Sequence, residues 1–594
     1  MRNKLRIVML AAIVAVTMLV PAGVFAGTTA AATPDAIGTT GIKWQKSLGT
    51  GWSSAPTPPA LIGGSIYVGA GDKVYKMNKD TGKQEAVSKS IGGTVGYAMM
   101  PVISDGNGYI YVSTAKCQIV KLKASDLSIV WKSAETFDGQ NVCPVEYIDG
   151  RVYSGTWGDD NDGGTFFCID GSTGKTIWKK FDSEGYYWAG AAKLGDRIIF
   201  GSDNQTLYSI GADAENTSGI KALSLKVSEK YSNNVRSTPA VSGNYAYFTT
   251  TSATVMSSSA TEGKLYKVSL ASDGTPEKVT DYDFGSSSCS PVISGDRIYV
   301  GGNKGKLSAF DTDLNQKWTT TTNGGEIKGD ILVSTGTAGK VSIYSTGNNG
   351  VGGIYCVQAG SKLTEGMTFV PQHRQYCISP VTAGDDGTLY YKNDSGYIMA
   401  VNGVSDSSAV SAKATSTGYQ SVKVLWNNKA NATAYTVYRS TDGKTFVKVS
   451  TIVVSKVNYD FGYNTTFYNE KGLTTNKAYY YKVTATLLDG STTAAATASK
   501  VRPLPASAKV STAAGSRKIT VKWGKVTGAG GYCVYRATSK NGSYKKVKTM
   551  TCTKFVNTKL KKGKTYYYKV KAYRTVSGKK VFGGWSNISY KKVK

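Results

Sequence analysis

Short apolar runs separated by turns of Gly, Asp and Asn recur along residues 42–403. Each copy begins with Pro or a small residue and continues through three short strands to a turn that leads to Trp. Clear copies start at Pro59, Pro101 and Pro144, and further copies start near Ala189, Pro239, Pro291, Gly329 and Pro380. The spacing of roughly 40–50 residues is that of one four-stranded blade of a β-propeller. The pattern therefore predicts an all-β propeller over residues 42–403.

Acidic residues in this region stand mostly where a chain reversal is expected. Asp149-Gly150, Gly195-Asp196, Gly243-Asn244 and Gly295-Asp296 each lie between two apolar runs. Tight hairpins need residues that accept positive φ, and Gly, Asn and Asp do so most easily. We therefore interpret these carboxylates as turn formers and not as catalytic acids.

The ends of the repeat region predict how the ring closes. The last unit, residues 388–402, lacks an outer strand with Trp, and residues 42–48 form an isolated strand that contains Trp44. Pairing of these two segments would place both chain ends in one blade and leave no free sheet edge. We count eight units, and seven blades is the alternative if the irregular unit near 329–371 is not a blade.

The third and fourth strands of the units carry the most specific motif. Residues 167–178 read FCIDGSTGKTIW, and weaker copies end at Trp131, Trp318 and Lys83. This motif closely resembles the repeat of pyrroloquinoline-quinone-type propellers. The resemblance implies that Trp44, Trp131, Trp178 and Trp318 are structural and dock between neighbouring blades. It admits two functional classes, namely quinone-dependent dehydrogenases and non-catalytic propellers such as the lipoprotein of the outer-membrane barrel-assembly machine.

After a linker at 404–417, one order of strand patterns occurs twice, in residues 418–503 and 504–594. Both copies contain an early Trp, a Tyr-rich strand, and a Leu six residues before a Tyr (Leu473 and Tyr479, Leu560 and Tyr566). These features resemble fibronectin type III β-sandwiches, in which this Tyr forms a corner with the backbone. We expect Trp426 and Trp523 to be core residues.

The N-terminus has the features of an export signal. Three basic residues precede an apolar run from Ile7 to Val20, and small residues surround a cleavage site after Ala26. We predict a signal peptide over 1–26, a linker over 27–41, and no membrane-spanning segment in the mature chain. The protein would then be secreted or bound to the cell wall. Its eight cysteines include no adjacent pair and are interpreted as buried apolar residues, although disulfides remain an alternative.

The net charge of +31 is concentrated at the C-terminus. Residues 27–408 carry 33 basic and 36 acidic residues, residues 409–503 carry 12 and 4, and residues 504–594 carry 23 and none. A folded, acid-free module favours a polyanionic partner, and export favours cell-wall polymers or surface glycans over nucleic acid. The alternative is a basic face that only keeps the module soluble. The lysines predicted to contact such a polymer are Lys545, Lys546, Lys548, Lys559, Lys561, Lys562 and Lys564.

Catalytic motifs are scarce in the chain. A quinone enzyme of this repeat class would need a calcium site, a base and often a disulfide between adjacent cysteines, and this sequence has no adjacent cysteines. His373 is the single histidine, and the acidic run at 159–164 misses the EF-hand spacing. We predict no catalytic residue, no metal and no cofactor, and keep a secreted quinone-dependent or carbohydrate-active enzyme as the alternative.

One group of residues suggests binding. Residues just before the first strand of each unit should converge on the central channel, and aromatic side chains interleaved with bases would suit an anionic, sugar or peptide ligand. The predicted channel-mouth residues are Trp52, Tyr97, Tyr186, Tyr187, Trp188, Arg236, Lys328, Arg374 and Tyr376. The alternative is that they only plug the channel. The sequence as a whole favours an exported binding or scaffold protein, with a protein partner on the propeller face as one possibility.

Overall fold

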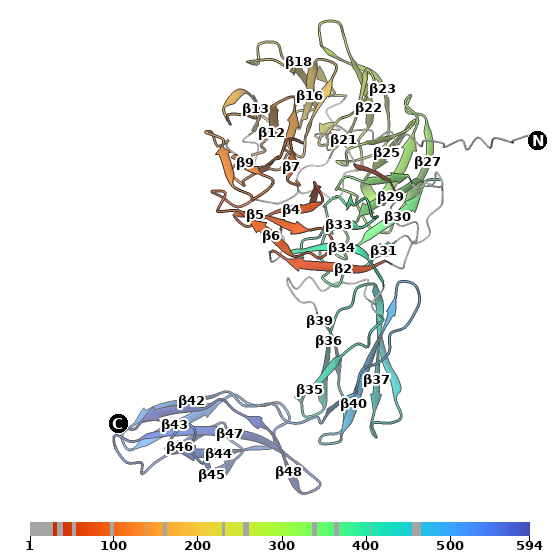
Figure 1. Cartoon of the computed structure of the whole chain (residues 1–594). Coiled ribbons are helices and arrows are strands. Elements are labelled where there is room, and N and C mark those ends of the chain that lie inside the picture. The colour runs from red at the N-terminus through yellow and green to blue at the C-terminus, as the bar shows by residue number, and fades with distance from the viewer. Residues whose placement is uncertain are drawn as a thin grey trace, which may run out of the picture.

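The structure is a computed structural model, shown in Figure 1. It describes residues 28–31, 40–49, 55–95, 100–137, 139–158, 163–227, 232–252, 261–335, 341–360, 367–404, 407–453 and 465–594. The predicted signal peptide lies outside the described residues, as do Trp52, Tyr97 and residues 159–162 of the acidic run. Among the described residues, no helix is long and apolar enough to cross a membrane.

Eight antiparallel sheets surround a common centre within the described part of residues 40–404, which is the arrangement of a β-propeller (Figure 1). The first three sheets contain β3 (Ala60–Ile62), β4 (Ser65–Ala70), β5 (Lys73–Asn78) and β6 (Gln84–Val87); β7 (Ile103–Ser104), β8 (Tyr109–Ser113), β9 (Ile119–Lys123) and β10 (Ile129–Lys132); and β11 (Glu146–Ile148), β12 (Arg151–Gly155), β13 (Gly164–Asp170) and β14 (Thr176–Asp182). The next three contain β15 (Ala191–Leu194), β16 (Arg197–Ser202), β17 (Thr206–Gly211) and β18 (Lys221–Ser224); β19 (Asn234–Val235) and β20 (Ala240–Ser242), which both pair with β21 (Tyr245–Thr251), then β22 (Leu265–Leu270) and β23 (Pro276–Tyr282); and β24 (Val292–Ser294), β25 (Arg297–Gly301), β26 (Lys306–Phe310) and β27 (Gln316–Thr321). The last two contain β28 (Leu332–Thr335), β29 (Val341–Thr346), β30 (Ile354–Gln358) and β31 (Met367–Phe369); and β32 (Thr382–Ala383), β33 (Leu389–Lys392), β34 (Tyr397–Val404) and β2 (Thr40–Ser47).

The last of these sheets closes the ring as predicted. Strand β2 pairs antiparallel with β34, in a register that runs from Thr40 opposite Val404 to Ser47 opposite Tyr397. The irregular unit near 329–371 forms a sheet of its own, β28–β31. Two differences from the sequence prediction fall in the expected linker at 27–41. Strand β1 (Thr28–Ala31) pairs in parallel with β28, and β2 already begins at Thr40.

The outer-strand tryptophans dock on the turn of the next sheet. Trp44 on β2 covers Gly82, and its indole nitrogen donates to the Lys79 carbonyl oxygen at 2.8 Å. Trp131 on β10 covers Gly174 in the same way. Burial of a large aromatic side chain contributes about 2–3 kcal/mol, so this contact is a principal link between sheets. Trp178 packs against Phe200 of the next sheet, and Trp318 packs against the core that contains Val357.

Two β-sandwiches follow the ring (Figure 1). In the first, β35 (Ala412–Gly418), β36 (Ser421–Asn427) and β39 (Thr465–Glu470) face β38 (Val447–Val453), β37 (Ala432–Ser440), β40 (Tyr479–Leu487) and β41 (Ser499–Val501). In the second, β42 (Val510–Gly515), β43 (Lys518–Trp523) and β46 (Lys554–Asn557) face β45 (Lys545–Met550), β44 (Gly531–Ala537), β47 (Thr565–Val576), β48 (Lys579–Trp585) and β49 (Ser589–Lys592). A single 3₁₀ turn, η3 (Asn303–Gly305), is the remaining helical element among the described residues.

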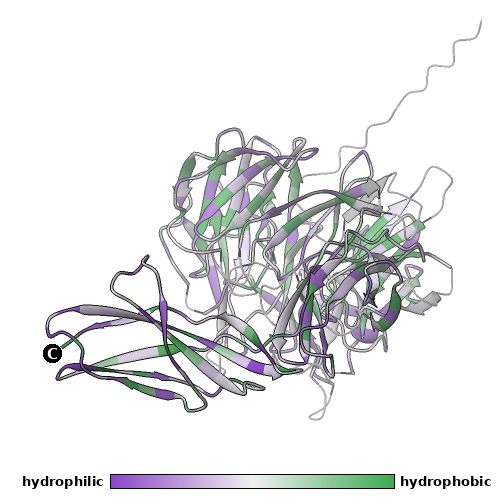
Figure 2. Cartoon of the chain, turned by 90° about the horizontal axis from the view of Figure 1, so that it is seen from below, coloured by the Kyte–Doolittle hydropathy of each residue, from purple (hydrophilic) through white to green (hydrophobic). Residues whose placement is uncertain are grey.

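The sandwich cores form where the Trp and Tyr pattern predicts. Trp426 and Trp523 are buried in the two cores, and hydrophobic and hydrophilic segments alternate along the strands (Figure 2). The predicted corner is present, because the backbone N–H of Thr474 donates to the Tyr479 hydroxyl at 3.0 Å. The first sandwich begins earlier than the predicted boundary at 418. Strand β35 starts at Ala412, inside a Ser/Ala-rich stretch whose composition resembles a linker but which pairs with β36.

Hydrogen bonds join the ring to the first sandwich. The backbone N–H of Asn431 donates to the Val370 carbonyl at 2.7 Å, and the Val370 N–H donates to Oδ1 of Asn431 at 2.9 Å. The guanidinium of Arg374 donates to the Ala432 carbonyl at 2.6 Å. After it leaves β34, the chain therefore contacts the ring again, and these hydrogen bonds join the first sandwich to the ring beside β31.

Candidate functional site

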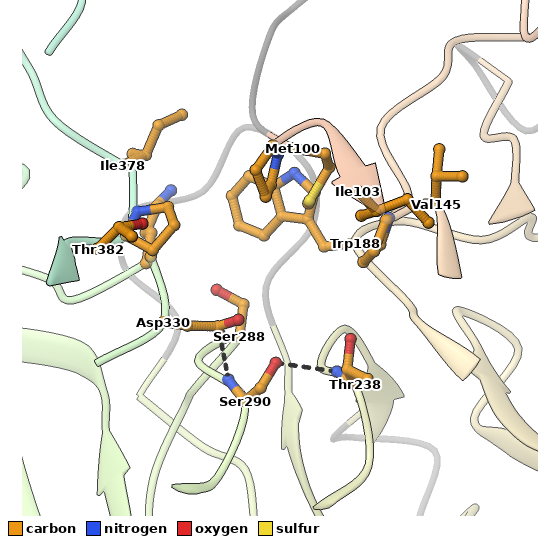
Figure 3. A pocket seen from close by; sticks show the side chains of 15 residues that line it. Met100, Ile103, Val145, Trp188, Thr238, Ser288, Ser290, Asp330, Ile378 and Thr382 are labelled. Atoms are coloured by element: carbon orange, nitrogen blue, oxygen red, sulfur yellow. Dashed lines mark hydrogen bonds between the residues drawn. The ribbon is translucent and has the colours of Figure 1, made fainter. Parts of the chain in front are cut away.

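A pocket lies at the centre of the ring, where segments from several sheets converge (Figure 3). Its walls come mainly from the residues that precede or begin the first strands of the sheets, as the sequence pattern predicted. The lining residues are Met100, Pro101, Ile103, Pro144, Val145, Trp188, Thr238, Ser288, Ser290, Lys328, Gly329, Asp330, Ile378, Pro380 and Thr382. Most of these side chains are apolar, and the polar ones gather on one side.

The polar side of the pocket is a short hydrogen-bonded chain (Figure 3). The backbone N–H of Thr238 donates to the Ser290 hydroxyl at 3.1 Å, and the Ser290 N–H donates to Oδ1 of Asp330 at 2.8 Å. Burial raises the pKa of Asp330 to about 6, against the opposing effect of its hydrogen bonds from Ser290. In its ionised form, which the hydrogen bonds from Ser290 favour, the carboxylate can accept hydrogen bonds from a ligand.

Trp188 is held in an unusual conformation at the edge of this pocket. Its φ of +59° lies in the left-handed region, which costs a non-glycine residue about 1–2 kcal/mol. Its indole projects into the pocket near Met100 (Figure 3), and its Nε1 is buried without a hydrogen-bond partner among the described residues. A buried donor left unsatisfied costs about 1–3 kcal/mol. The Trp188 ring therefore forms part of the pocket wall, while its N–H is not accessible to a ligand in this conformation.

A buried ion pair lies next to Tyr187 and Trp188. Nε and Nη2 of Arg236 contact the carboxylate of Asp203 at distances from 2.6 to 3.2 Å, with side chains only 5% and 6% exposed. The Arg236 guanidinium lies 4.7 Å from the centre of the Tyr187 ring, and Tyr187 packs on Trp188 with 4.7 Å between ring centres. Arg236 was predicted at the channel mouth, but its charge is already compensated. It positions the aromatic pair and does not face an open site.

The other predicted mouth residues divide between the pocket and other places. Lys328 lines the pocket, 5.6 Å from the Trp188 ring centre and 3.4 Å from the Glu326 carboxylate. Tyr186 is fully buried in the core between two sheets, so its prediction as a mouth residue is not met. Burial lowers the pKa of Arg374 to about 10, and its guanidinium binds Ala432 of the first sandwich.

The Arg374 segment shows why position before a strand is an incomplete guide. Tyr376 is 37% exposed, yet neither it nor Arg374 belongs to the pocket lining, whereas Ile378 two residues later does. The segment that leads into β32 first passes the sandwich joint and only then reaches the channel. The sequence pattern marks the segment but not the point at which it turns inward.

The sequence analysis also missed several pocket residues. Asp330 and Ser290 were not singled out, because Gly-Asp and Ser-Pro pairs occur elsewhere in this chain as ordinary turn signals. Met100 and Ile378 are apolar residues that precede a strand, and nothing in the sequence distinguishes them from core positions. An acidic residue directly before an apolar strand of the irregular unit was the one available signal.

The cysteines and acidic residues show no metal-like grouping in the described part of the chain. All eight cysteines are free thiols; seven are buried, as interpreted from the sequence, and Cys552 is exposed. The lysines predicted to contact an anionic polymer are exposed, on β45 and on the turn before β47.

A protein-family model described as outer membrane protein assembly factor BamB matches residues 35–146 and 139–409. The chain belongs to the BamB family. This membership confirms the pyrroloquinoline-quinone-type repeat predicted from residues 167–178. Solved structures with a similar fold include BamB from Moraxella catarrhalis, with 13% identity, coverage of 61% of this chain and 98% of that chain, and a TM-score of 0.41. They also include the WD40 β-propeller domain of Doa1, with 12% identity, coverage of 62% and 97%, and a TM-score of 0.35. No curated protein matches the chain significantly.

Proposed function

We propose that this BamB-family protein is an exported scaffold whose propeller binds an extended segment of a partner protein in the central pocket. We further propose that the eight sheets are eight blades, that the two sandwiches are fibronectin type III domains, and that the basic C-terminal module contacts anionic polymers of the cell surface. The family description as an assembly factor supports a role in binding proteins. The paired corner tyrosines and core tryptophans support the fibronectin type III assignment.

The observation that carries the binding proposal is the largely apolar pocket at the centre of the ring, with the Trp188 ring and the Asp330 carboxylate both in its lining. A polypeptide supplies all the matching groups. Its apolar side chains fill the space near Met100 and Ile378, and an N–H or hydroxyl donates to Asp330. Pockets that combine an apolar lining with a few placed polar groups are typical ligand sites.

The proposal is tested by site-specific photo-crosslinking in the native host. When the full chain carries a crosslinking amino acid at position 378, on the pocket wall, it should become crosslinked to one distinct partner protein. The same amino acid at Val279, which is 46% exposed on β23, is the matched control and should capture none. Replacing Trp188 with Ala should reduce the yield from position 378, and Trp188→Phe, which keeps a smaller aromatic ring on the pocket wall, should give an intermediate yield. Equal labelling from both positions, or none from position 378, would refute the pocket as the binding site.

A further inference from the structure

The outward face of the last sandwich presents lysines that rest on aromatic rings. Lys569 on β47 lies opposite Tyr535 on β44, and its ammonium is 3.9 Å from the centre of the Tyr544 ring. The ammonium groups of Lys569 and Lys571 lie 4.6 and 4.3 Å from the Trp585 ring. Alternate residues of β47 point to opposite faces, and the inward set forms the core. These lysines therefore belong to one outer face.

The first sandwich repeats the arrangement at equivalent positions. Lys482 on β40 lies opposite Tyr438 on β37, and its ammonium is 4.2 Å from the centre of the Phe446 ring. Lys500 on β41 similarly lies 5.4 Å from the ring of Tyr480, which is on β40 like Lys482. A lysine opposite a tyrosine and over a second ring thus occurs in both modules. We call Lys482, Lys569 and Lys571 the face lysines.

Within the part of the two modules that the structure describes, the face lysines form no ion pair. Residues 504–594 contain no acidic side chain, so the face lysines of the second module have no carboxylate within their own domain. In the first module, Glu470 accepts from Arg439 and from the Tyr481 hydroxyl, and Asp442 caps its own turn. Cation–π contacts hold the ammonium groups in place without neutralising them, and each contributes about 0.5–1 kcal/mol at an exposed site. Both faces are therefore ordered, positively charged surfaces.

We propose that the two outer faces are equivalent binding sites for one class of ligand, an anionic polysaccharide. The proposal rests on the proposed contact with anionic polymers and names its site and its ligand class. Anionic groups on the polymer would pair with the face lysines. Sugar rings would pack on the exposed ring of Tyr590, which is 58% exposed and stacks on Tyr567.

The same contacts argue against single-stranded nucleic acid. Its sequence-tolerant binding depends on bases that stack on open aromatic faces. Ammonium groups already lie over the rings of Phe446, Tyr544 and Trp585. A polymer that presents charge rather than flat bases fits this arrangement better.

Two sites on one chain have a further consequence. A polymer long enough to reach both modules binds the second site as an intramolecular event, which raises overall affinity without new contacts. Short fragments engage one module at a time. The affinity of the full chain should therefore rise with polymer length until both modules are occupied.

The test uses the full chain and dextran sulfate, with uncharged dextran of equal length as the control polymer. The face variant is Lys482→Gln, Lys569→Gln and Lys571→Gln together. The matched control, Lys413→Gln, Lys522→Gln and Lys554→Gln, removes the same charge from exposed positions on β35, β43 and β46, the opposite sheets of the two sandwiches. We expect the face variant to bind dextran sulfate at least about tenfold more weakly, because ordered charges contribute at both linked sites, and the control variant to lose less than about threefold.

A second variant separates ordered charge from total charge. Phe446→Ala with Tyr544→Ala leaves every lysine in place but removes the ring under Lys482 and one of the two rings under Lys569, and it should also weaken binding. Thermal melting of each variant checks that the modules stay folded. Equal losses in the face and control variants would overturn the faces as sites while leaving a general anionic contact. Failure of the parent protein to bind dextran sulfate would overturn both proposals, and tighter binding of an oligothymidine would favour nucleic acid and overturn the polysaccharide.

Discussion

The contact between Trp131 and Gly174 makes a quantitative prediction about how the sheets are held together. Gly174 has φ of +75°, and a Cβ atom added there would lie 2.7 Å from Cε3 and 2.8 Å from Cδ2 of the Trp131 ring. Carbon atoms in contact normally lie about 3.5–4.0 Å apart. Substitution of Gly174 by Ala therefore forces the ring off the turn or moves the turn itself.

The expected cost has two parts. A non-glycine residue in the left-handed region costs about 1–2 kcal/mol. Overpacking of a filled contact adds about 1–3 kcal/mol. Gly195 is a matched control, because its φ is +62° and nothing lies within 4 Å of an added Cβ. Gly195→Ala should therefore lose only the first part, and Gly174→Ala should lose both.

Urea unfolding of the full chain measures the difference, and a double variant assigns it. In a background with Trp131→Ala, the extra cost of Gly174→Ala should disappear, since the two residues then no longer collide, and the coupling free energy should be about 1–3 kcal/mol. If Gly174→Ala and Gly195→Ala shift the midpoint equally, or if Trp131→Ala leaves the difference intact, the ring contact does not link the sheets as argued.

Three further predictions concern closure, the buried ion pair and pH. Deletion of β2 removes the partner of β34 and the indole over Gly82, so the melting temperature should fall markedly; a parental melting curve would contradict closure by β2. Asp203→Asn leaves the buried Arg236 unpaired and should lower the free energy of unfolding by about 3–5 kcal/mol, an effect that Asp203→Asn with Arg236→Met should largely reverse; an unchanged urea midpoint would show the pair to be dispensable. Burial lowers the pKa of His373 to about 4, whereas an unfolded histidine titrates near about 6.5, so the unfolded state binds more protons between these values and stability falls as pH drops through this range. His373→Gln should remove that part of the pH dependence, and an identical slope in both proteins would contradict it.

The repeat was predictable because its determinants are local. A Thr-Gly turn followed by Trp specifies both a tight reversal and an apolar plug, and these requirements fall within the 12 residues from 167 to 178. The pairing of residues 42–48 with the last unit was predictable for a related reason. The last unit lacked an outer strand, and residues 42–48 formed a strand that belonged to no other unit. Pairing of the two closes the ring and leaves no unpaired edge.

The pocket was less predictable because its geometry depends on how segments distant in sequence converge. Trp188 was expected near the channel, but its left-handed backbone and its contact with Tyr187, which lies against Arg236, could not be inferred from the residues before one strand. Arg374 was misplaced because the same segment serves the sandwich joint. The sequence alone does not distinguish a basic residue that faces a ligand from one that pairs with a carboxylate or a backbone carbonyl.

The joint between ring and sandwich also determines how the protein would carry mechanical load. The chain leaves the ring through β34, yet Asn431 is bonded to Val370, which follows β31 of the neighbouring sheet. Tension applied at the C-terminal modules, such as drag on a tethered molecule, is thus divided between two adjacent sheets. In the closing sheet this tension also acts on the pairing between β34 and β2. The strand β2 therefore helps to hold the strand that leads to the C-terminal modules. A pull at the C-terminal modules would therefore be shared by two adjacent sheets, and β34 could leave its sheet only by breaking its pairing with both β2 and β33.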